Sequence, residues 1–207
     1  MIVRELYIVR HGQTDHNAKG IIQGKGVDLP LNETGQKQAN AFFQAYRSVP
    51  FDALYSSTLL RAQQTIAPFK QSDIPHFIKS DLDEISWGDL EGKITTLESD
   101  ERFKQLIARW RAGDLNAKPS STGESPYELQ QRQQRFLEYL LTTSHKKILI
   151  ATHGRFIRAF MCTLTGRPLS EMEQFNHANL CLYKVNQLQN GRFEIVTHFE
   201  TGHLASL

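Results

Sequence analysis

Short apolar runs bounded by polar residues recur along the chain and predict buried strands. One run covers residues 2–9 and another covers residues 147–151. Between such runs, apolar residues spaced three or four apart predict amphipathic helices, as in the stripe made by Phe103, Leu106 and Trp110. Strands that alternate with helices in this way favour an α/β fold whose sheet is covered by helices on both faces.

Two helices carry start signals in their polar residues. Asn32 is predicted to cap a helix, and Glu33 in its first turn suits the positive end of the helix dipole. This helix has no capping box, because Gly35 occupies the third helical position. Residues 125–128, Ser-Pro-Tyr-Glu, combine a serine cap, a proline at the first helical position and a glutamate at the third. A later helix is therefore expected to start there.

The carboxyl end of the chain has the pattern of a β-hairpin. Residues 180–185 and 193–197 alternate in strand fashion, and Asn190-Gly191 supplies a turn between them. A chain of 207 residues is long enough for one sizeable core, and no repeat or linker divides it. We therefore expect a single domain over residues 1–207, with a three-layer α/β/α architecture and a mostly parallel central sheet.

Composition and charge narrow the classes of partner. A hydrophobic content of 40% and a charged content of 22% fit an ordinary soluble globular protein. The formal net charge of +2 is too small to indicate a nucleic-acid or membrane partner. Cys162 and Cys181 lie in apolar contexts without disulfide or zinc spacing, so both are expected in the core. No signal-peptide pattern or membrane-length apolar run is present, which favours a cytoplasmic protein.

Two predicted strands end in a histidine followed by a glycine. The first run ends in Arg10-His11-Gly12, and the run at 147–151 is followed by Thr152-His153-Gly154. Ligands of open α/β sheets bind outside the carboxyl ends of the strands, so neighbouring strands would bring both histidines to one pocket. Arginine suits phosphate oxygens, and histidine can act as a nucleophile or proton carrier. An arginine-histidine pair that merely follows a core strand remains the alternative.

Two further segments have residues suited to an anion. Residues 13–31 form a long polar loop, in which Asn17 and Gln23 are the side chains expected to face a phosphate; a solvated loop without a role is the alternative. Residues 56–58 offer caps for another helix, and Arg61 falls in its first turns. A cation there is explained if an anion binds between the helix dipole and the guanidinium. A solvated surface arginine is the other interpretation.

These residues, taken together and in order, resemble the histidine phosphatase superfamily, also called phosphoglycerate mutase-like. The resemblance covers nearly the whole chain. Its motifs are Arg10-His11-Gly12 with Asn17, Gln23-Gly24, Asp28-Leu29-Pro30-Leu31, Gly35 with Gln38-Ala39, Ser56-Ser57 with Arg61-Ala62 and Thr65, Glu84 with Gly88 and Glu91-Gly92, Gly123-Glu124-Ser125, and His153-Gly154. One departure is His16, where many relatives have tryptophan, which leaves the packing of the first loop open.

The resemblance implies a mechanism and a set of site residues. His11 would be the nucleophile, Glu84 the proton donor, and His153, if protonated, a further cation for the transition state. The phosphate-binding residues that the resemblance implies are Arg10, Arg61, Asn17, Gln23 and Gly24. Catalysis of phosphoryl transfer depends on positioning and charge neutralisation, and fixed cations could supply both without a metal or cofactor.

The expected activity is a metal-independent phosphomonoesterase that acts on a small phosphorylated metabolite through a phosphohistidine intermediate. Phosphoglycerate mutases carry a longer insertion before the second histidine, whereas the segment from Gly92 to Gly123 is short here. The alternatives are a mutase and a non-catalytic phosphate-binding module. The sequence leaves open the substrate, the oligomeric state and the residues that recognise the leaving group, for which Arg155, Arg158, Phe156 and Arg111 are candidates.

Overall fold

A six-stranded sheet with the strand order β3-β2-β4-β1-β5-β6 forms the centre of the computed structural model, which describes residues 1–94, 96–205 and 207. The strands are β1 (Ile2–Arg10), β2 (Ala53–Ser56), β3 (His76–Ile78), β4 (Lys147–Thr152), β5 (Leu182–Leu188) and β6 (Phe193–Glu200). The pairs β1–β4, β2–β4 and β2–β3 are parallel, whereas β5 runs antiparallel to β1 and β6. The mostly parallel sheet expected from the sequence is confirmed.

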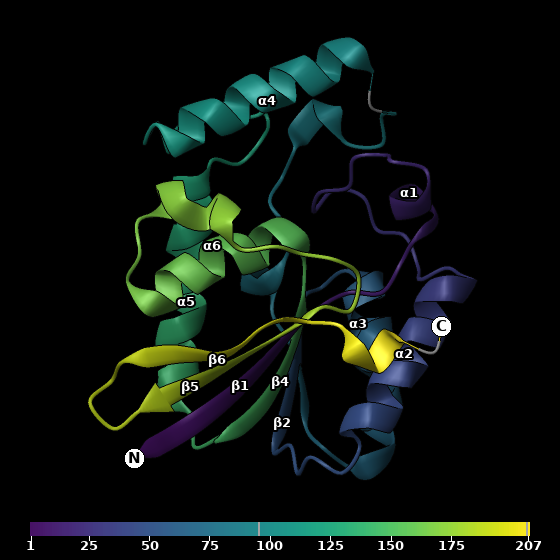
Figure 1. Ribbon diagram of the computed structural model, residues 1–207, viewed down its shortest axis with the longest axis vertical. Coiled ribbons are helices and arrows are strands. Elements are labelled where there is room, and N and C mark those ends of the chain that lie inside the picture. Colours follow the sequence, from purple (N-terminus) through teal and green to yellow (C-terminus); the bar gives the residue numbers. More distant parts are fainter. Residues whose placement is uncertain (95, 206) are drawn as a thin grey trace.

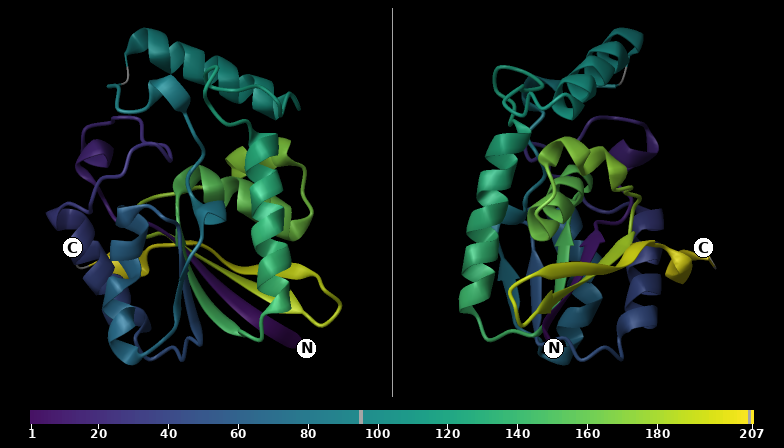
Figure 2. Two further views of the ribbon diagram at one scale, coloured as in Figure 1. Left: turned by 180° about the vertical axis from the view of Figure 1, so that it is seen from behind. Right: turned by 60° about the vertical axis from the view of Figure 1, so that its left-hand side comes forward.

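Helices cover both faces of this sheet and complete the three layers (Figures 1 and 2). The α-helices are α1 (Asp15–Ala18), α2 (Glu33–Tyr46), α3 (Leu60–Ile66), α4 (Leu97–Arg111), α5 (Pro126–Thr142) and α6 (Gly154–Thr165). α2 and α3 lie on one face, and α5 and α6 lie on the other. α4 lies beyond α6, at the end of the molecule toward which the parallel strands point. Short 3-10 helices occupy Ala67–Ser72, Ser80–Leu82, Gly88–Leu90, Leu169–Gln174 and Gly202–Leu204.

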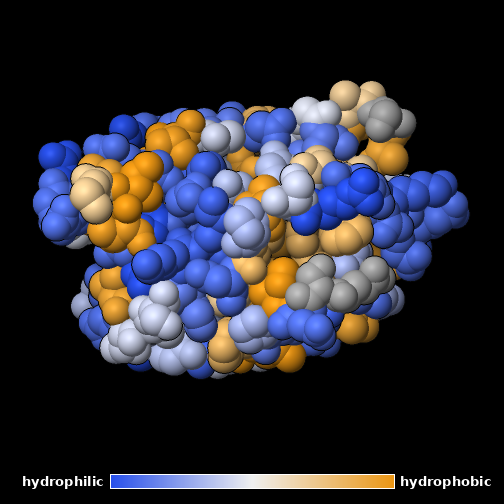
Figure 3. Space-filling view, turned by 90° about the horizontal axis from the view of Figure 1, so that it is seen from below, coloured by the Kyte–Doolittle hydropathy of each residue, from blue (hydrophilic) through white to orange (hydrophobic). Residues whose placement is uncertain are grey.

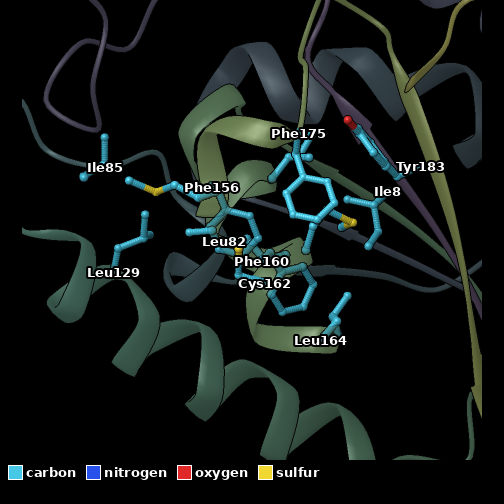
Figure 4. Close-up of a cluster of buried hydrophobic side chains, with 14 of the residues drawn as sticks. Ile8, Leu82, Ile85, Leu129, Phe156, Phe160, Cys162, Leu164, Phe175 and Tyr183 are labelled. Carbon is cyan, nitrogen blue, oxygen red and sulfur yellow. The ribbon is translucent and has the colours of Figure 1, made fainter. Parts of the chain in front are cut away.

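The apolar run of β1 is buried on both faces, as a central parallel strand requires. Leu6 and Ile8 belong to the core on the α5–α6 side, and Tyr7 and Val9 belong to the core on the α2–α3 side. Figure 4 shows the first of these cores, in which side chains from α6 meet Ile8 of β1. Both cysteines are fully buried, as expected. Two packed faces therefore hold β1 rigid, and its carboxyl end is a firm base for a site.

Helix starts agree with the sequence in two cases and differ in a third. Asn32 caps α2 through the N–H of Gly35, and Ser125 caps α5 in a capping box with Glu128. The caps expected at residues 56–58 are wrong, because Leu59 is the first flanking residue of α3 and makes no side-chain cap. The long first loop also contains the short helix α1, which the polar pattern did not indicate.

The end of the molecule remote from α4 is viewed in Figure 3, where hydrophobic residues lie in separate patches among hydrophilic ones. The predicted hairpin is present as β5 and β6, and Gly191 of its turn has a φ of 81°. A residue with a side chain rarely adopts this backbone region, so glycine suits the turn. Within the described part of the chain, no helix combines the length and apolarity that a membrane crossing needs.

Candidate active site

The two histidine-bearing strand ends lie side by side. Arg10, the last residue of β1, is paired in register with Thr152, the last residue of β4, and the His11 N–H donates to the Thr152 carbonyl at 2.9 Å. The rings of His11 and His153 are therefore neighbours, with centroids 5.1 Å apart. The expectation that both histidines would converge if their strands paired is met, because β1 and β4 are adjacent and parallel.

His11 is arranged to present an unprotonated nitrogen. Its Nδ1 lies 2.7 Å from the carbonyl oxygen of Gly12. Because a carbonyl oxygen only accepts, Nδ1 must hold the ring proton. Burial lowers the pKa of His11 well below its usual value, and the nearby cations Arg61 and Arg10 lower it further. The neutral ring therefore has its lone pair on Nε2, the form that a nucleophile requires.

His153 is held by a hydroxyl group. Its Nε2 lies 2.7 Å from Ser57 Oγ, which also accepts the N–H of Leu59 at 3.2 Å. His153 Nδ1 is buried and has no partner among the described residues. Burial, followed by the charge of Arg61, lowers the pKa of His153 well below its usual value. The ring is therefore neutral before an anion binds, and a third cation at this position would need the substrate to raise that pKa.

Arg10 is an unpaired cation at the edge of the site. Its Nε is buried without a partner, and the described residues provide no hydrogen bond or ion pair to its guanidinium. Burial lowers the pKa of Arg10, and the negative charges near it, including that of Glu84, offset this only in part. Arg10 is partly buried, and a charge without a partner carries a free-energy cost there. An anion that bound to Arg10 would remove this cost.

Arg61 holds the first loop in place. Its Nη1 donates to the Val27 carbonyl at 2.5 Å and its Nη2 donates to the Gly24 carbonyl at 3.1 Å, which leaves Nε buried without a partner. The N–H of Leu60 at the start of α3 is bonded to the Asp28 carboxylate. A carboxylate of the chain thus already occupies the helix terminus where we expected an anion. The charge of Arg61 still acts on the site, since it lowers the pKa of both histidines.

Gly24 has a structural task in this loop. A Cβ at position 24 would lie 2.1 Å from Glu91 Oε1 and 2.7 Å from the Ile85 carbonyl, so no larger residue fits without a shift. The close approach lets Glu91 accept the N–H groups of Gly26 and Trp87. Gly24 therefore brings its carbonyl to Arg61 and ties the first loop to the loop that contains Glu84.

Asn17 and Gln23 form one network above His11. The side-chain oxygen Oδ1 of Asn17 accepts from the Thr14 N–H and from Asn179 Nδ2, which leaves the Asn17 Nδ2 group free. Gln23 Nε2 lies 2.7 Å from Thr14 Oγ1, and Gln23 Oε1 is buried without a partner. Asn179 also donates to the His11 carbonyl. Asn179 was not expected from the sequence, since it lies 162 positions from Asn17.

Glu84 is held at the start of α6. Its Oε1 accepts the N–H of Phe156 at 2.9 Å, and its Oε2 accepts the N–H of Arg155 at 3.1 Å. The positive end of the helix dipole stabilises a carboxylate at this position. The rival carboxylates point elsewhere: Asp83 accepts from Thr58, and Asp81 pairs with Arg135. Of these three carboxylates, only Glu84 lines the cavity that His11 lines.

These groups surround a cavity of about 210 Å³, whose lining residues include Arg10, His11, Asn17, Gln23 and Glu84. Arg61, His153 and Gly24 were expected at the same site but are not among the residues that line this cavity. A larger cavity of about 410 Å³ lies beneath α4, but no histidine lines it. The titratable groups with lowered pKa values therefore identify the smaller cavity as the site.

The sequence did not indicate His177, which also lines this cavity. Its Nδ1 is buried without a partner, and its ring would touch any Cβ at Gly154. Burial lowers the pKa of His177 to about 2, and the charges of Arg10, Arg158 and Arg155 contribute. His177 follows no strand and belongs to no motif in the sequence, so only the fold brings it here. Within the residues described, no three His, Cys, Asp or Glu side chains gather as metal ligands would.

The fold and the site together define an α/β enzyme with paired histidines and an unpaired arginine at the carboxyl ends of parallel strands. The family model of the histidine phosphatase superfamily (branch 1) matches residues 6–201. The chain belongs to this superfamily, and it is an enzyme of the phosphatase type.

Relatives of this chain include phosphatases and mutases. The adenosylcobalamin/α-ribazole phosphatase of Salmonella typhimurium is 29% identical over 85% of this chain and 87% of that protein. A 2,3-bisphosphoglycerate-dependent phosphoglycerate mutase of Bartonella tribocorum is 32% identical over 79% of this chain and 82% of the mutase. The phosphoserine phosphatase of Entamoeba histolytica, solved with 3-phosphoglyceric acid, has a TM-score of 0.81 and 25% identity, covering 97% of this chain and 99% of that one.

Proposed function

We propose that this protein is a metal-independent phosphomonoesterase that hydrolyses a small phosphorylated metabolite through a phosphohistidine intermediate. The observation that carries this proposal is that a neutral His11 and the unpaired cation of Arg10 line one cavity. The Nδ1 of this His11 donates to the Gly12 carbonyl. A nucleophile with a free lone pair and a cation without a counter-ion together suit attack on a phosphate dianion. The expected cytoplasmic location stays a prediction.

In the first step, His11 Nε2 attacks phosphorus, a nitrogen–phosphorus bond forms, and the bond from phosphorus to the ester oxygen breaks. Arg10 neutralises charge on the phosphoryl oxygens, and the amide N–H groups of Asn17, together with the second N–H of the Gln23 amide, position them. Glu84, when protonated, gives its proton to the leaving alkoxide, which departs as an alcohol. Phosphate binding raises the pKa of His153, whose unpartnered Nδ1 then donates to the transferring group.

In the second step, water attacks the phosphohistidine. Glu84, now a carboxylate, accepts a proton from this water, and inorganic phosphate leaves as His11 Nε2 recovers its lone pair. The α-ribazole and phosphoserine phosphatases among the relatives support a small metabolite as the substrate. A mutase is the second candidate, because a relative of similar identity is named as one. In a mutase the phosphoryl group returns to an alcohol instead of water.

The test of this function is phosphate release from p-nitrophenyl phosphate in the presence of a chelator. Wild-type activity is expected to persist with the chelator and to disappear in His11→Ala, whereas His198→Ala, which alters an exposed histidine of β6, is expected to retain it. Labelled substrate quenched in alkali should trap a base-stable, acid-labile phosphoenzyme on His11.

Three results would contradict the proposal. A requirement for added magnesium or zinc would exclude metal independence. A label on another residue would reassign the nucleophile. Conversion of 3-phosphoglycerate to 2-phosphoglycerate that exceeded phosphate release and needed a bisphosphoglycerate primer would support the mutase.

A further inference from the structure

A buried arginine in the cavity wall has no task in the reaction described above. Arg155 is 8% exposed and lines the same cavity as His11 and Glu84. Its backbone N–H donates to Glu84 Oε2 at 3.1 Å. Because Glu84 protonates the leaving oxygen in the proposed reaction, atoms beyond that oxygen lie near residue 155. Arg155 therefore belongs to the leaving-group end of the cavity.

Three aromatic rings hold the Arg155 guanidinium in place. Its central carbon lies 5.4 Å from the ring centre of Phe103, 5.7 Å from Trp110 and 5.8 Å from Trp87. These distances are within the range of cation–π attraction. Arg155 is largely buried, and electrostatic attraction is stronger where the surroundings contain little water. The Arg155 side chain is thus fixed before a ligand arrives.

Arg155 shares its ion-pair partner with a second arginine. Arg155 Nη1 donates to one oxygen of Glu173, and Arg158 Nη1 donates to the other. One carboxylate therefore serves two guanidinium groups, and the cluster keeps one excess positive charge. Arg155 Nε and Nη2 have no hydrogen bond to any described residue. Unlike Arg158 Nε, they are not fully buried, and Arg158 does not line the cavity.

We propose that Arg155 binds a carboxylate of the leaving group, so that the substrates are phosphate monoesters of small hydroxy acids. This inference rests on the proposed function and names its substrate class. The planar fork of a guanidinium matches the two oxygens of a carboxylate. The cavity of about 210 Å³ is smaller than the roughly 300–1,000 Å³ of sites for drug-sized ligands. It therefore holds a phosphoryl group with a short leaving group, whose carboxylate is a few bonds from the ester oxygen.

The test compares two esters that differ at one group. 3-Phosphoglycerate has a carboxylate where glycerol 3-phosphate has a hydroxymethyl group. The readout is the ratio of their kcat/KM values for phosphate release, together with the ratio of their Kd values from calorimetry. The kinetic ratio is expected to exceed about ten in the wild type and to approach one in Arg155→Gln, since a hydrogen bond to a charged group is worth roughly ten- to a hundredfold.

Two further variants separate binding from packing. Arg155→Lys keeps the charge but lacks the planar fork, so its ratio is expected to lie between those of the wild type and Arg155→Gln. Arg158→Gln breaks the other ion pair with Glu173 and removes no donor from the cavity, but it leaves Glu173 to neutralise Arg155 alone. Its ratio is therefore expected to fall less than that of Arg155→Gln.

The possible results separate the two proposals. Phosphate release without a preference for the carboxylate, or a preference that Arg155→Gln leaves unchanged, would overturn the role of Arg155 alone. An equal fall of the ratio in Arg158→Gln would assign the effect to packing and would also overturn it. Absence of phosphate release from both esters and from p-nitrophenyl phosphate, with Arg155-dependent binding of 3-phosphoglycerate, would instead overturn the proposed function.

Discussion

At the scale of single residues, the hydrogen-bond partners of His11 and Glu84 suit the proposed nucleophile and the proposed acid in different ways. Gly12 fixes the ring proton of His11 on Nδ1, away from the attacking nitrogen. The start of α6 fixes both oxygens of Glu84 through the N–H groups of Arg155 and Phe156. The two groups can therefore be removed one at a time, and each removal should have its own kinetic signature.

Glu84→Gln should damage the transfer of phosphate from alkyl esters far more than from p-nitrophenyl phosphate. An alkoxide needs a proton to leave, whereas p-nitrophenolate is stable without one. General acid catalysis is typically worth roughly a hundred- to ten-thousand-fold, and the difference between the two substrates should reach this range. The measurement is the rate of the first, enzyme-phosphorylating step by rapid quench, because in the proposed reaction Glu84 also activates water in the second step.

Asp83→Asn is the control, since Asp83 hydrogen-bonds Thr58 rather than facing the histidines. It should affect both substrates equally. Equal losses in Glu84→Gln would mean that Glu84 only positions the phosphate, and a selective loss in Asp83→Asn would move the acid to Asp83.

At the scale of elements, one arginine of α5 holds the loop that contains Glu84. Arg132 pairs with Glu124 through Nε at 2.7 Å and Nη2 at 3.0 Å. Its remaining N–H groups donate to the carbonyls of Asp81, Asp83 and Glu84. Both partners of the ion pair are largely buried. The capping box at Ser125 sets the start of α5. Arg132 then ties the loop that contains Glu84 to this helix.

Glu124→Gln should reduce the free energy of unfolding by about 3–5 kcal/mol, because it leaves the buried charge of Arg132 without a counter-charge. Urea unfolding followed by circular dichroism measures this change. Asp114→Asn is the matched control: it breaks the exposed ion pair with Arg109, which is worth about 0–1 kcal/mol. A cost in Glu124→Gln no larger than in the control would mean that the pair does not hold the loop.

At the scale of the whole molecule, the site gathers three histidines that the fold keeps neutral. Burial is the largest cause that lowers the pKa of His11, His153 and His177. In the unfolded chain these side chains take up protons near pH 6.5. The unfolded state therefore binds more protons than the folded state once the pH falls below that value. The contribution of these three histidines to the free energy of unfolding is therefore full above pH 6.5. It is lost as the pH decreases toward their lowered pKa values.

His177→Gln should make this decline shallower, because it removes one of the three groups. Between pH 6.5 and 4.5, each such histidine lowers the free energy of unfolding by up to about 1.4 kcal/mol per pH unit. Urea unfolding of wild type and variant at several pH values across this window gives the two slopes. His198→Gln, which alters an exposed histidine, should keep the wild-type slope. A slope in His177→Gln equal to that of the wild type would mean that His177 takes up a proton without unfolding.

The sequence by itself determined the framework of this protein. Hydrophobic runs and helical stripes indicated the three layers, because burial on both faces of a strand leaves a continuous apolar run. The polar ends of two such runs indicated His11 and His153, because loops at the carboxyl ends of parallel strands are where α/β proteins bind ligands. The capping residues Asn32 and Ser125 were visible because a cap is a local interaction within one turn.

The tertiary structure alone decided which groups meet and what state they adopt. Segments far apart in the chain meet at three places. They supply the partners of Arg61, bring His177 and Asn179 to the site, and place three aromatic rings around Arg155. No local pattern records such contacts. The protonation states also depend on the fold, because desolvation is set by all the atoms that surround a group and not by its neighbours in sequence. The sequence thus named the chemical groups, and packing decided which of them face the substrate and which support those that do.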